Sequence, residues 1–303
     1  MLVPLPERVA IRDVGPRDGL QPEAPVAVSD RIRLVHALQG AGLRHIEVAA
    51  FVSPKAVPAM ADAADVLAGI ERRPGVTYAA LVPNLKGAEL ALAAGVDELT
   101  VTISASEAYN QRNVKMSTAE SVEVIEAIVA AADLVPVDAV VSCAFGSPYE
   151  GEIAPDTVVG LAAELVERGA GAITFADTTG MATPRRIEEL CDSFGPHVTA
   201  ATGLHLHDTR GTALVNAYAA LQLGIRRFDT AVGGLGGSPF AHGAGGNLAT
   251  EELVAMLDDL GVSTGIDVDA LVTAAGLVEE LVGRPVPSGV AHAGPRTRRA
   301  PTA

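Results

Sequence analysis

The sequence contains no tryptophan, and Phe, Trp and Tyr together make up only 3% of its 303 residues. Because large aromatic side chains are scarce, the hydrophobic core has to be built mainly from Ala, Val, Leu and Ile. Hydrophobic residues nevertheless make up 49% of the chain, which is enough for a sizeable core. A length of 303 residues allows one large α/β barrel or two ordinary domains.

Cysteines and long apolar runs are also scarce. Only Cys143 and Cys191 are present, which disfavours a disulfide framework and fits a reducing compartment. No uninterrupted apolar run approaches the ~18 residues of a membrane span. The N-terminus lacks a basic segment and carries Pro4 and Pro6 where the apolar part of a signal peptide begins. These absences predict a cytoplasmic protein without a membrane partner.

Positive charge is in the minority, since the formal net charge is −15 at pH 7. An acidic chain is repelled by phosphate backbones and by anionic membrane surfaces, so neither nucleic acid nor a membrane is expected as the main partner. A local basic entrance for a small anionic substrate is still compatible with this charge.

Short Val/Ile-rich runs alternate with longer Ala/Leu-rich amphipathic runs along the chain. The expected strands are 9–14, 44–49, 76–82, 98–103, 137–143, 172–176, 204–207 and 226–231. The expected helices are 29–39, 58–70, 85–94, 118–132, 155–168, 184–194, 212–223 and 248–260. Eight such units predict an α/β protein with a (β/α)8 TIM barrel. A doubly wound open sheet is the alternative, but no Gly-x-Gly-x-x-Gly follows the first strand.

The chain shows no boundary between domains. Residues 1–285 are expected to form one catalytic domain, in which an apolar helical segment at 268–281 follows the barrel. This segment is expected to pack outside the barrel or to take part in a subunit contact. Residues 286–303, rich in Pro, Arg and Ala, are expected to form a flexible tail.

His205 and His207 form the pair with the clearest chemical potential. Residues i and i+2 of a strand point to the same side, so both imidazoles can reach one ion. A chance pair in a half-buried strand is the alternative interpretation. Asp208 should point to the other face and is better assigned to capping the next helix.

Further polar residues fall where the expected strands end, which is the catalytic end of such a barrel. Arg17 and Asp18 follow the first strand on a glycine-rich turn, Glu47 lies in the second, and Asp177 follows the sixth. A solvated turn is the alternative for Arg17 and Asp18.

A glycine-rich loop at 233–247 follows the eighth strand. Because it has few large side chains, it could act as a flexible lid or bind an anion through its backbone amides. Asn247 ends the loop as either a helix N-cap or an amide-oxygen ligand. Two imidazoles, one carboxylate and one amide oxygen suit an octahedral Mg²⁺ or Mn²⁺, and the set lacks the thiolates or third histidine of many zinc sites.

Several longer motifs resemble those of the 3-hydroxy-3-methylglutaryl-CoA lyase family. They are residues 14–21 (VGPRDGLQ), 51–55 (FVSPK), 83–87 (PNLKG), 141–144 (VSCA), 148–151 (PYEG), 234–237 (GLGG) and 246–251 (GNLATE). The resemblance extends from about residue 9 to 285 and agrees in order with the barrel.

The resemblance implies a (β/α)8 barrel that cleaves an acyl-CoA substrate by a metal-dependent retro-Claisen reaction, giving acetyl-CoA and a keto acid. It implies Mg²⁺ or Mn²⁺ as cofactor and a homodimer as the assembly. The implied metal ligands are Asp18, His205, His207 and Asn247. The implied catalytic residues are Arg17, Asp18, His205, Glu47 and Ser238, and the implied substrate-binding residues are Asp13, Gln21, Asp177, Gly236 and Gly237.

Two positions depart from the family's pattern. Ser238 stands where the lyases have a loop cysteine, and a hydroxyl is a much weaker acid than a thiol near neutral pH. Asp138 stands where they commonly have an arginine in the fifth strand. These departures leave open a substrate with a different 3-substituent or a reaction in the condensing direction.

Three alternatives accompany this prediction. An acyl-CoA/oxo-acid condensing enzyme of the same superfamily usually reads Arg-Asp-Gly-Glu-Gln, where this chain has Gly19-Leu20-Gln21, and carries a regulatory domain. A related pyruvate aldolase lacks the long loop after the eighth strand. A catalytically silent barrel that binds metal or CoA is favoured only by Ser238.

Overall fold

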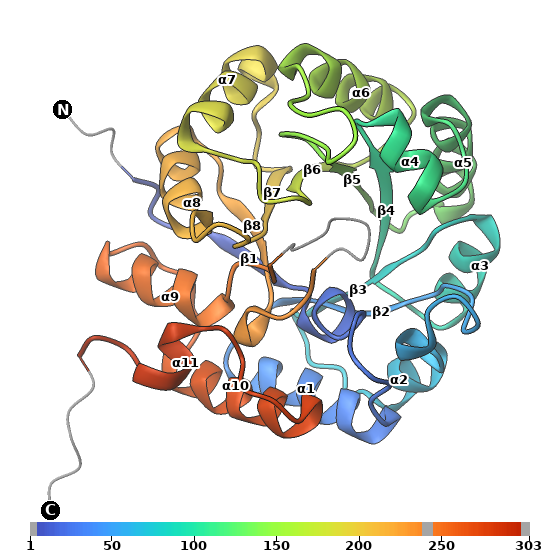
Figure 1. Ribbon diagram of the computed structural model, residues 1–303. Coiled ribbons are helices and arrows are strands. Elements are labelled where there is room, and N and C mark those ends of the chain that lie inside the picture. The colour runs from blue at the N-terminus through green and yellow to red at the C-terminus, as the bar shows by residue number, and fades with distance from the viewer. Residues whose placement is uncertain (1–4, 238–244, 298–303) are drawn as a thin grey trace, which may run out of the picture.

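The computed structural model describes residues 5–237 and 245–297, and its centre is a closed barrel of parallel strands (Figure 1). The strands follow one another around the barrel in sequence order, and β8 closes it by pairing with β1. They are β1 Ala10–Asp13, β2 His45–Ala50, β3 Thr77–Leu81, β4 Glu98–Ser104, β5 Val137–Ser142, β6 Ala172–Asp177, β7 Thr202–Leu206 and β8 Arg227–Thr230. The predicted (β/α)8 barrel is confirmed.

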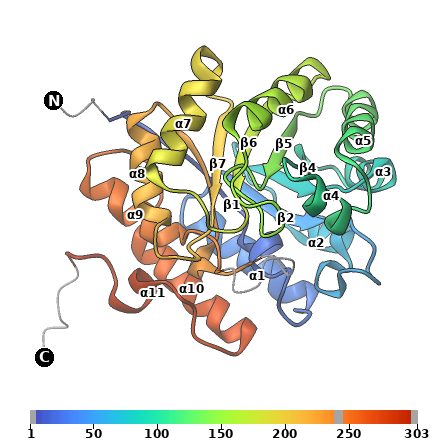
Figure 2. The ribbon, with the colours of Figure 1, turned by 45° about the horizontal axis from the view of Figure 1, so that its top comes forward.

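Helices surround the barrel on its outside (Figures 1 and 2). Those between strands and after β8 are α1 Val28–Gly40, α2 Ala63–Gly69, α3 Leu85–Ala93, α4 Glu107–Asn113, α5 Thr118–Ala132, α6 Pro155–Glu167, α7 Pro184–Phe194, α8 Ala213–Gln222 and α9 Thr250–Asp259. Two more, α10 Val268–Val282 and α11 Gly289–Ala293, follow the barrel. The buried faces of these helices and the outward faces of the strands form one hydrophobic core.

The elements depart from prediction in three places. The single helix expected at 58–70 is divided into a 3-10 turn at Pro58–Met60 and α2, because Asp62 between them adopts a left-handed φ of 57°. The short helix α4 was not expected, since its sequence is polar and lacks an apolar stripe. Nor was α11, which falls in the segment expected to be a tail; nearby, Val286 and Ser288 are each 2% exposed.

Glycines end several helices, as the sequence predicts. Gly42 after α1 and Gly169 after α6 have φ values of 101° and 98°, a conformation that other residues adopt at a cost. At Gly42 a side chain would also collide with the backbone, because a Cβ there would lie 2.5 Å from the carbonyl oxygen of Gly265.

The segment after the barrel packs on the barrel's outside. Helix α10 lies against α1, and α11 lies against α9 and α10 (Figure 1). This agrees with one of the two places that the sequence allows for the apolar run at 268–281. Among the described residues, no helix is long and apolar enough to cross a membrane.

A buried network of ion pairs fills the part of the barrel interior where β5, β6 and β8 begin. Arg12 donates to both carboxylate oxygens of Asp229, at 2.9 and 2.7 Å, and its Nη1 lies 2.8 Å from Asp138. Arg227 reaches the same Asp138 at 2.9 Å. Arg12, Asp138 and Asp229 are each at most 2% exposed. Asp138 is therefore an interior ion-pair partner.

Removing one partner from this network should be costly, because the remaining charges stay buried without compensation. We expect Arg12→Met to lower the free energy of unfolding by about 3–5 kcal/mol. Urea denaturation followed by circular dichroism measures this. The control is Arg33→Met, since Arg33 pairs with Asp30 on the surface and such pairs contribute at most about 1 kcal/mol. Equal effects of the two substitutions would contradict the role assigned to the network.

Candidate metal and active site

His205 and His207 face each other at the C-terminal end of β7, with their Nε2 atoms 3.1 Å apart. The Nδ1 of His205 lies 3.3 Å from a carboxylate oxygen of Asp229, and the Nδ1 of His207 lies 3.0 Å from the carbonyl oxygen of Gly245. Because both partners are acceptors, each Nδ1 carries a hydrogen, which leaves each Nε2 as the ring nitrogen that can bind a metal ion.

Asp18 follows β1, which is separated from the histidine strand β7 by β8 in the closed barrel. It lies on η1, a turn of π-helix at Gly15–Gly19 that directly follows β1. Its carboxylate and the two imidazoles each offer a ligand atom within 4.8 Å of the others. Burial disfavours the Asp18 carboxylate, but Arg17, His205 and His207 outweigh this and hold its pKa at about 2. Asp18 is therefore ionised.

Burial, followed by the neighbouring His205, lowers the pKa of His207 to about 4. His207 is therefore neutral near pH 7. The cluster combines a neutral imidazole with an ionised carboxylate, and both are the protonation states that bind metal.

Asn247 completes the group. Its Nδ2 donates to Asp18 at 2.7 Å and to the carbonyl oxygen of Leu235 at 2.8 Å. Its Oδ1 is buried and has no hydrogen-bond partner in the described part of the chain. The N-cap interpretation is wrong, since Ala249 occupies the cap position of α9. Thr212 occupies the cap position of α8, so Asp208 is not its N-cap, although the Asp208 carboxylate accepts from the amide of Ala213, the first residue of α8.

These four residues fit a divalent cation. Adjacent ligands of one octahedral ion, with bonds of about 2.1 Å at right angles, lie about 3 Å apart. The two imidazole Nε2 atoms have this separation. An ionised carboxylate and an otherwise unpartnered amide oxygen beside them add hard donors, which Mg²⁺ and Mn²⁺ prefer.

Arg17 lies beside the cluster and is fixed by two carboxylates. Its Nη1 donates to Asp18 at 2.6 Å, and its Nε forms an ion pair with Glu47. Glu47 is fully buried, and its second oxygen has no partner among the residues described. Glu47 therefore holds the guanidinium of Arg17 in place at the barrel mouth.

Two other predicted acids lie beneath the surface of the site. Asp13 accepts from the amides of Gly15 and Val232 at 2.8 and 3.0 Å and from the hydroxyl of Thr250 at 2.6 Å. Asp177 accepts from two backbone amides of the following turn, at 2.7 and 3.0 Å. Burial raises the pKa of each to about 6. These contacts show Asp13 and Asp177 bracing the loops that follow β1 and β6.

The glycine-rich loop passes close to the cluster before and after the undescribed residues. A Cβ at Gly236 would lie 2.4 Å from the Nδ2 of Asn247, and Gly236 also has a φ of 106°, so only glycine fits there. Ser238 lies outside the described residues.

The cluster opens into a cavity of about 540 Å³ within the barrel mouth, a size typical of small-molecule sites. Arg17, Asp18, Gln21, His205 and His207 line it, as does Gly237. The remaining wall comes from β3 to β6, from the loops after β2 and β3, and from α4, α5 and the connection between them. It includes Leu81, Thr102, Val140, Ser142, Ala176 and Thr178.

Of these wall residues, Ser142 belongs to the motif at 141–144, whereas Leu81, Thr102, Val140 and Ala176 belong to none of the motifs. Their signal in the sequence was the alternation of side chains along the strands, because in a barrel every second residue faces the interior.

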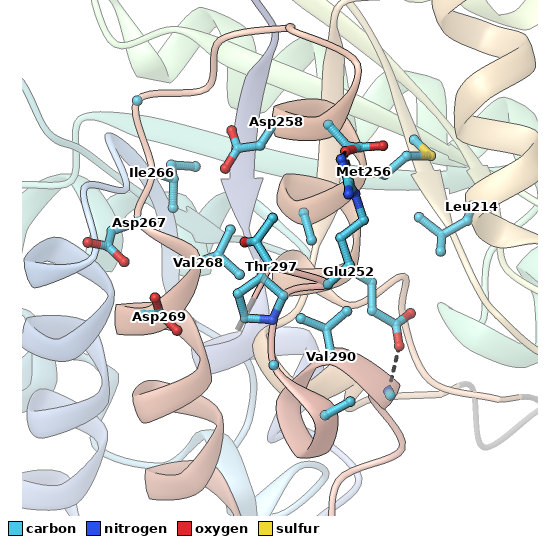
Figure 3. A pocket seen from close by; sticks show the side chains of 18 residues that line it. Leu214, Glu252, Met256, Asp258, Ile266, Asp267, Val268, Asp269, Val290 and Thr297 are labelled. Carbon is cyan, nitrogen blue, oxygen red and sulfur yellow. Dashed lines mark hydrogen bonds and ion pairs between the residues drawn. The ribbon is translucent and has the colours of Figure 1, made fainter. Parts of the chain in front are cut away.

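A larger hollow of about 1250 Å³ lies outside the barrel, between α9, α10 and α11 (Figure 3). Glu252 lines this hollow, and its carboxylate accepts from the amide of Gly289 at 2.6 Å. Its lining includes Asp258, Asp267 and Asp269. None of the predicted site residues lines it, so size alone does not locate the site in this molecule.

The fold and the cluster define a (β/α)8 barrel with a candidate divalent-metal site at the C-terminal ends of its strands. Residues 8–278 match the model of the HMGL-like family. The chain is 43% identical to a hydroxymethylglutaryl-CoA lyase of Bacillus subtilis over 290 residues, which are 94% of this chain and 97% of that protein. The chain belongs to the HMGL-like family, and the resemblance seen in the motifs is confirmed.

Other relatives agree. A Pseudomonas aeruginosa protein named 3-hydroxy-3-isohexenylglutaryl-CoA/hydroxymethylglutaryl-CoA lyase is 47% identical over 92% of this chain and 95% of its own length. An HMG-CoA lyase from Acinetobacter baumannii, solved in complex with coenzyme A and 3-methylmalate, superposes with a TM-score of 0.94. It is 39% identical, and the superposition covers 98% of each chain.

The metal assignment predicts a loss of affinity when one imidazole is removed. We expect His207→Ala to weaken Mn²⁺ binding by about tenfold or more, because second-sphere changes alone cost that much in metal sites. Titration followed by electron paramagnetic resonance of free Mn²⁺ measures the affinity directly. His197→Ala, which removes an exposed histidine, is the control. Equal Mn²⁺ affinity in both variants would contradict the ligand assignment.

The base of the glycine-rich loop is held by a buried acid. Both oxygens of Glu251 accept from the amide of Gly233, at 3.0 and 3.1 Å. Burial raises the pKa of Glu251 from 4.5 to about 7. The folded chain therefore binds this proton more tightly than the unfolded chain, so ionisation of Glu251 destabilises the fold as the pH rises from about 4.5 to 7.

Replacing Glu251 should reduce this dependence on pH. We expect the decrease in the free energy of unfolding between pH 5 and pH 8 to be smaller in Glu251→Gln than in the wild type, by about 2–3 kcal/mol. Urea denaturation at the two pH values measures it. Glu123→Gln, at an exposed position of α5, is the matched control. An unchanged pH dependence in Glu251→Gln would refute the raised pKa.

Proposed function

We propose that this chain cleaves 3-hydroxy-3-methylglutaryl-CoA, or a close 3-hydroxyacyl-CoA analogue, to acetyl-CoA and acetoacetate or the corresponding keto acid. The observation that carries the proposal is the cluster of Asp18, His205 and His207, which lines a cavity in the barrel mouth together with Arg17. The names of the relatives, and coenzyme A bound to one of them, support an acyl-CoA as substrate.

Asp18, His205, His207 and Asn247 are proposed to hold the cofactor, Mg²⁺ or Mn²⁺. The bound ion supplies Lewis-acid chemistry at the substrate's tertiary hydroxyl and at a carbonyl or carboxylate oxygen. The mixed nitrogen and oxygen donors support a hard divalent cation.

The chain's own residues account for the movement of protons and charge. Asp18 is proposed to remove the hydroxyl proton; His205 is the alternative, and it would first have to release the ion from Nε2, because its Nδ1 hydrogen is held by Asp229. The bond between C2 and C3 then breaks, its electron pair enters the thioester enolate, and the former hydroxyl carbon becomes the ketone of the keto acid. Arg17 is proposed to stabilise the enolate oxygen, while Glu47 positions the guanidinium through their ion pair.

Protonation of the enolate at carbon completes acetyl-CoA, and Ser238 or a water held by the loop is proposed as the donor. Gln21, Gly236 and Gly237 are proposed to bind the substrate at the rim of the cavity. Asp13 and Asp177 are proposed to support it from below, and their contacts to backbone amides are consistent with an indirect role. The homodimer and the cytoplasmic location stay predictions from the sequence.

Purified protein supplied with Mg²⁺ or Mn²⁺ should release acetyl-CoA and acetoacetate from 3-hydroxy-3-methylglutaryl-CoA. A coupled assay for each product measures the rate, and a metal chelator should abolish it reversibly. A sample that binds Mn²⁺ but turns over none of a panel of 3-hydroxyacyl-CoA thioesters would instead indicate a silent barrel.

Arg17→Gln should lower kcat by about 100-fold or more, because loss of one preorganised donor to a developing oxyanion has an effect of that order. Metal binding should persist, since Arg17 is not a ligand. The rate is compared with that of Arg72→Gln, in which an exposed arginine is replaced in the same way. A kcat within about threefold of wild type would remove Arg17 from the mechanism.

A further inference from the structure

The two imidazoles of the candidate metal site are held by different parts of the molecule. The Nδ1 of His207 lies 3.0 Å from the carbonyl oxygen of Gly245 in the glycine-rich loop, whereas the Nδ1 of His205 lies 3.3 Å from a carboxylate oxygen of Asp229. A carboxylate carries a full negative charge, so it is a stronger acceptor than a backbone carbonyl. The orientation of His205 therefore depends on a charged group of the barrel interior, and that of His207 on a loop.

Asp229 is itself held from below. It lies on β8, is 2% exposed, and accepts two hydrogen bonds from Arg12, one from Nε at 2.9 Å and one from Nη2 at 2.7 Å. A bidentate pair of this kind fixes the plane of the carboxylate as well as its distance. The oxygen that accepts from Nη2 is also the one that faces His205, so Arg12 determines where that oxygen lies.

Arg12 is anchored in turn to the other strands of the barrel. Its Nη1 lies 2.8 Å from Asp138 on β5 and 3.1 Å from Glu98 on β4, and Arg227 on β8 lies 2.9 Å from the same Asp138. These ion pairs join β1, β4, β5 and β8 through the barrel interior. Because acids surround the guanidinium of Arg12, it cannot turn away from Asp229 without separating buried charges.

The ion-pair network carries one negative charge in excess, since it pairs two arginines with three acids. Asp229 presents part of that charge to His205 at the upper end of the network. A carboxylate at this place keeps the imidazole hydrogen on Nδ1, leaves Nε2 free, and makes Nε2 a stronger electron donor to a metal ion. The network therefore has a chemical effect at the cavity, although neither Arg12 nor Asp229 lines it.

We propose that Asp229 and Arg12 are positioning residues of the metal site. Asp229 holds His205 in the tautomer and orientation that bind the ion, and Arg12 holds Asp229 in the place from which it can do so. The inference rests on the metal site of the proposed function. It extends that site below the cavity, to a charged interior that also stabilises the barrel.

The test compares Asp229→Asn with Glu98→Gln in the full chain. Both substitutions turn an acid that pairs with Arg12 into its amide, and each leaves two arginines with two acids, which favours folding. Of these two acids, Asp229 is the one that contacts His205. An amide can donate to Nδ1, which a carboxylate cannot, so Asp229→Asn allows the imidazole hydrogen to move to Nε2 and block the ion.

Two measurements follow each variant. Nitrogen-15 NMR of the histidine side chains in metal-free protein gives the tautomer, and the signal of His205 is assigned from its absence in His205→Gln. Electron paramagnetic resonance of free Mn²⁺ gives the affinity. Asp229→Asn should raise the fraction of His205 with hydrogen on Nε2 and weaken Mn²⁺ binding by about tenfold or more. Glu98→Gln should leave the tautomer and the affinity as in the wild type.

Arg12→Lys tests the second positioning residue and serves also if Asp229→Asn fails to fold. Lysine keeps the charge but cannot donate to both oxygens of Asp229 in the fork geometry of arginine, so Mn²⁺ binding should again be weaker than in the wild type. Wild-type affinity in folded Arg12→Lys overturns the role of Arg12.

The remaining outcomes separate this inference from the proposed function. An unchanged tautomer in folded Asp229→Asn overturns the positioning role of Asp229, and so does an equal loss of Mn²⁺ affinity in Glu98→Gln, because lost charge alone then explains the effect. A wild type that binds no Mn²⁺ overturns the metal site and with it this inference. Expected tautomers and affinities in a protein that cleaves no thioester overturn the proposed reaction and support the positioning roles.

Discussion

The ion pair between Arg12 and Asp229 joins the buried charges of the barrel interior to the candidate metal site. Asp229 binds Arg12 with both oxygens and also lies 3.3 Å from the Nδ1 of His205. Burial opposes the charge on Asp229, but Arg12 and His205 outweigh this and lower its pKa. A permanently ionised partner fixes the imidazole in the tautomer that leaves Nε2 free. The same contacts that satisfy buried charge therefore also prepare a ligand.

The closed barrel brings the other groups to this point. Asp18 and Asn247 are 229 positions apart in sequence, yet their side chains are hydrogen-bonded because β1 and β8 are neighbours in the barrel. The π-turn after β1 presents Arg17 and Asp18 together, and Glu47 on β2 secures Arg17 from the adjacent strand. Three consecutive strands of the closed order, β8, β1 and β2, thus supply or hold most of the charged side of the site, and β7 supplies the imidazoles.

One unpartnered buried oxygen indicates where a ligand belongs. Glu47, Asp177 and Asn247 each carry such an atom within the described chain, but so do Gln39 on α1 and Asn216 on α8. Of these residues, Asn247 is the one hydrogen-bonded to Asp18 of the cluster, and because a buried oxygen without a partner is costly, its Oδ1 points to a metal ion as partner. On the opposite wall, the hydroxyls of Thr102 and Ser142 pair with each other, and Val140 and Ala176 are apolar.

The sequence by itself determined the barrel, the family and the main chemical groups. Periodicity in the strands and helices is a local property, and residues 14–21 and 246–251 are contiguous motifs, so both are visible without coordinates. The spacing of His205 and His207 also predicted their common direction. Only the tertiary structure decided what contacts form across strands: that Asp13 and Asp177 bind backbone amides, that Asn247 is not a helix cap, and that Asp138 lies in an ion network. It likewise decided that Thr102, Val140 and Ala176 form one wall of the cavity. These contacts depend on the register and closure of the barrel, which place residues far apart in the chain within a few ångströms and which no local pattern encodes.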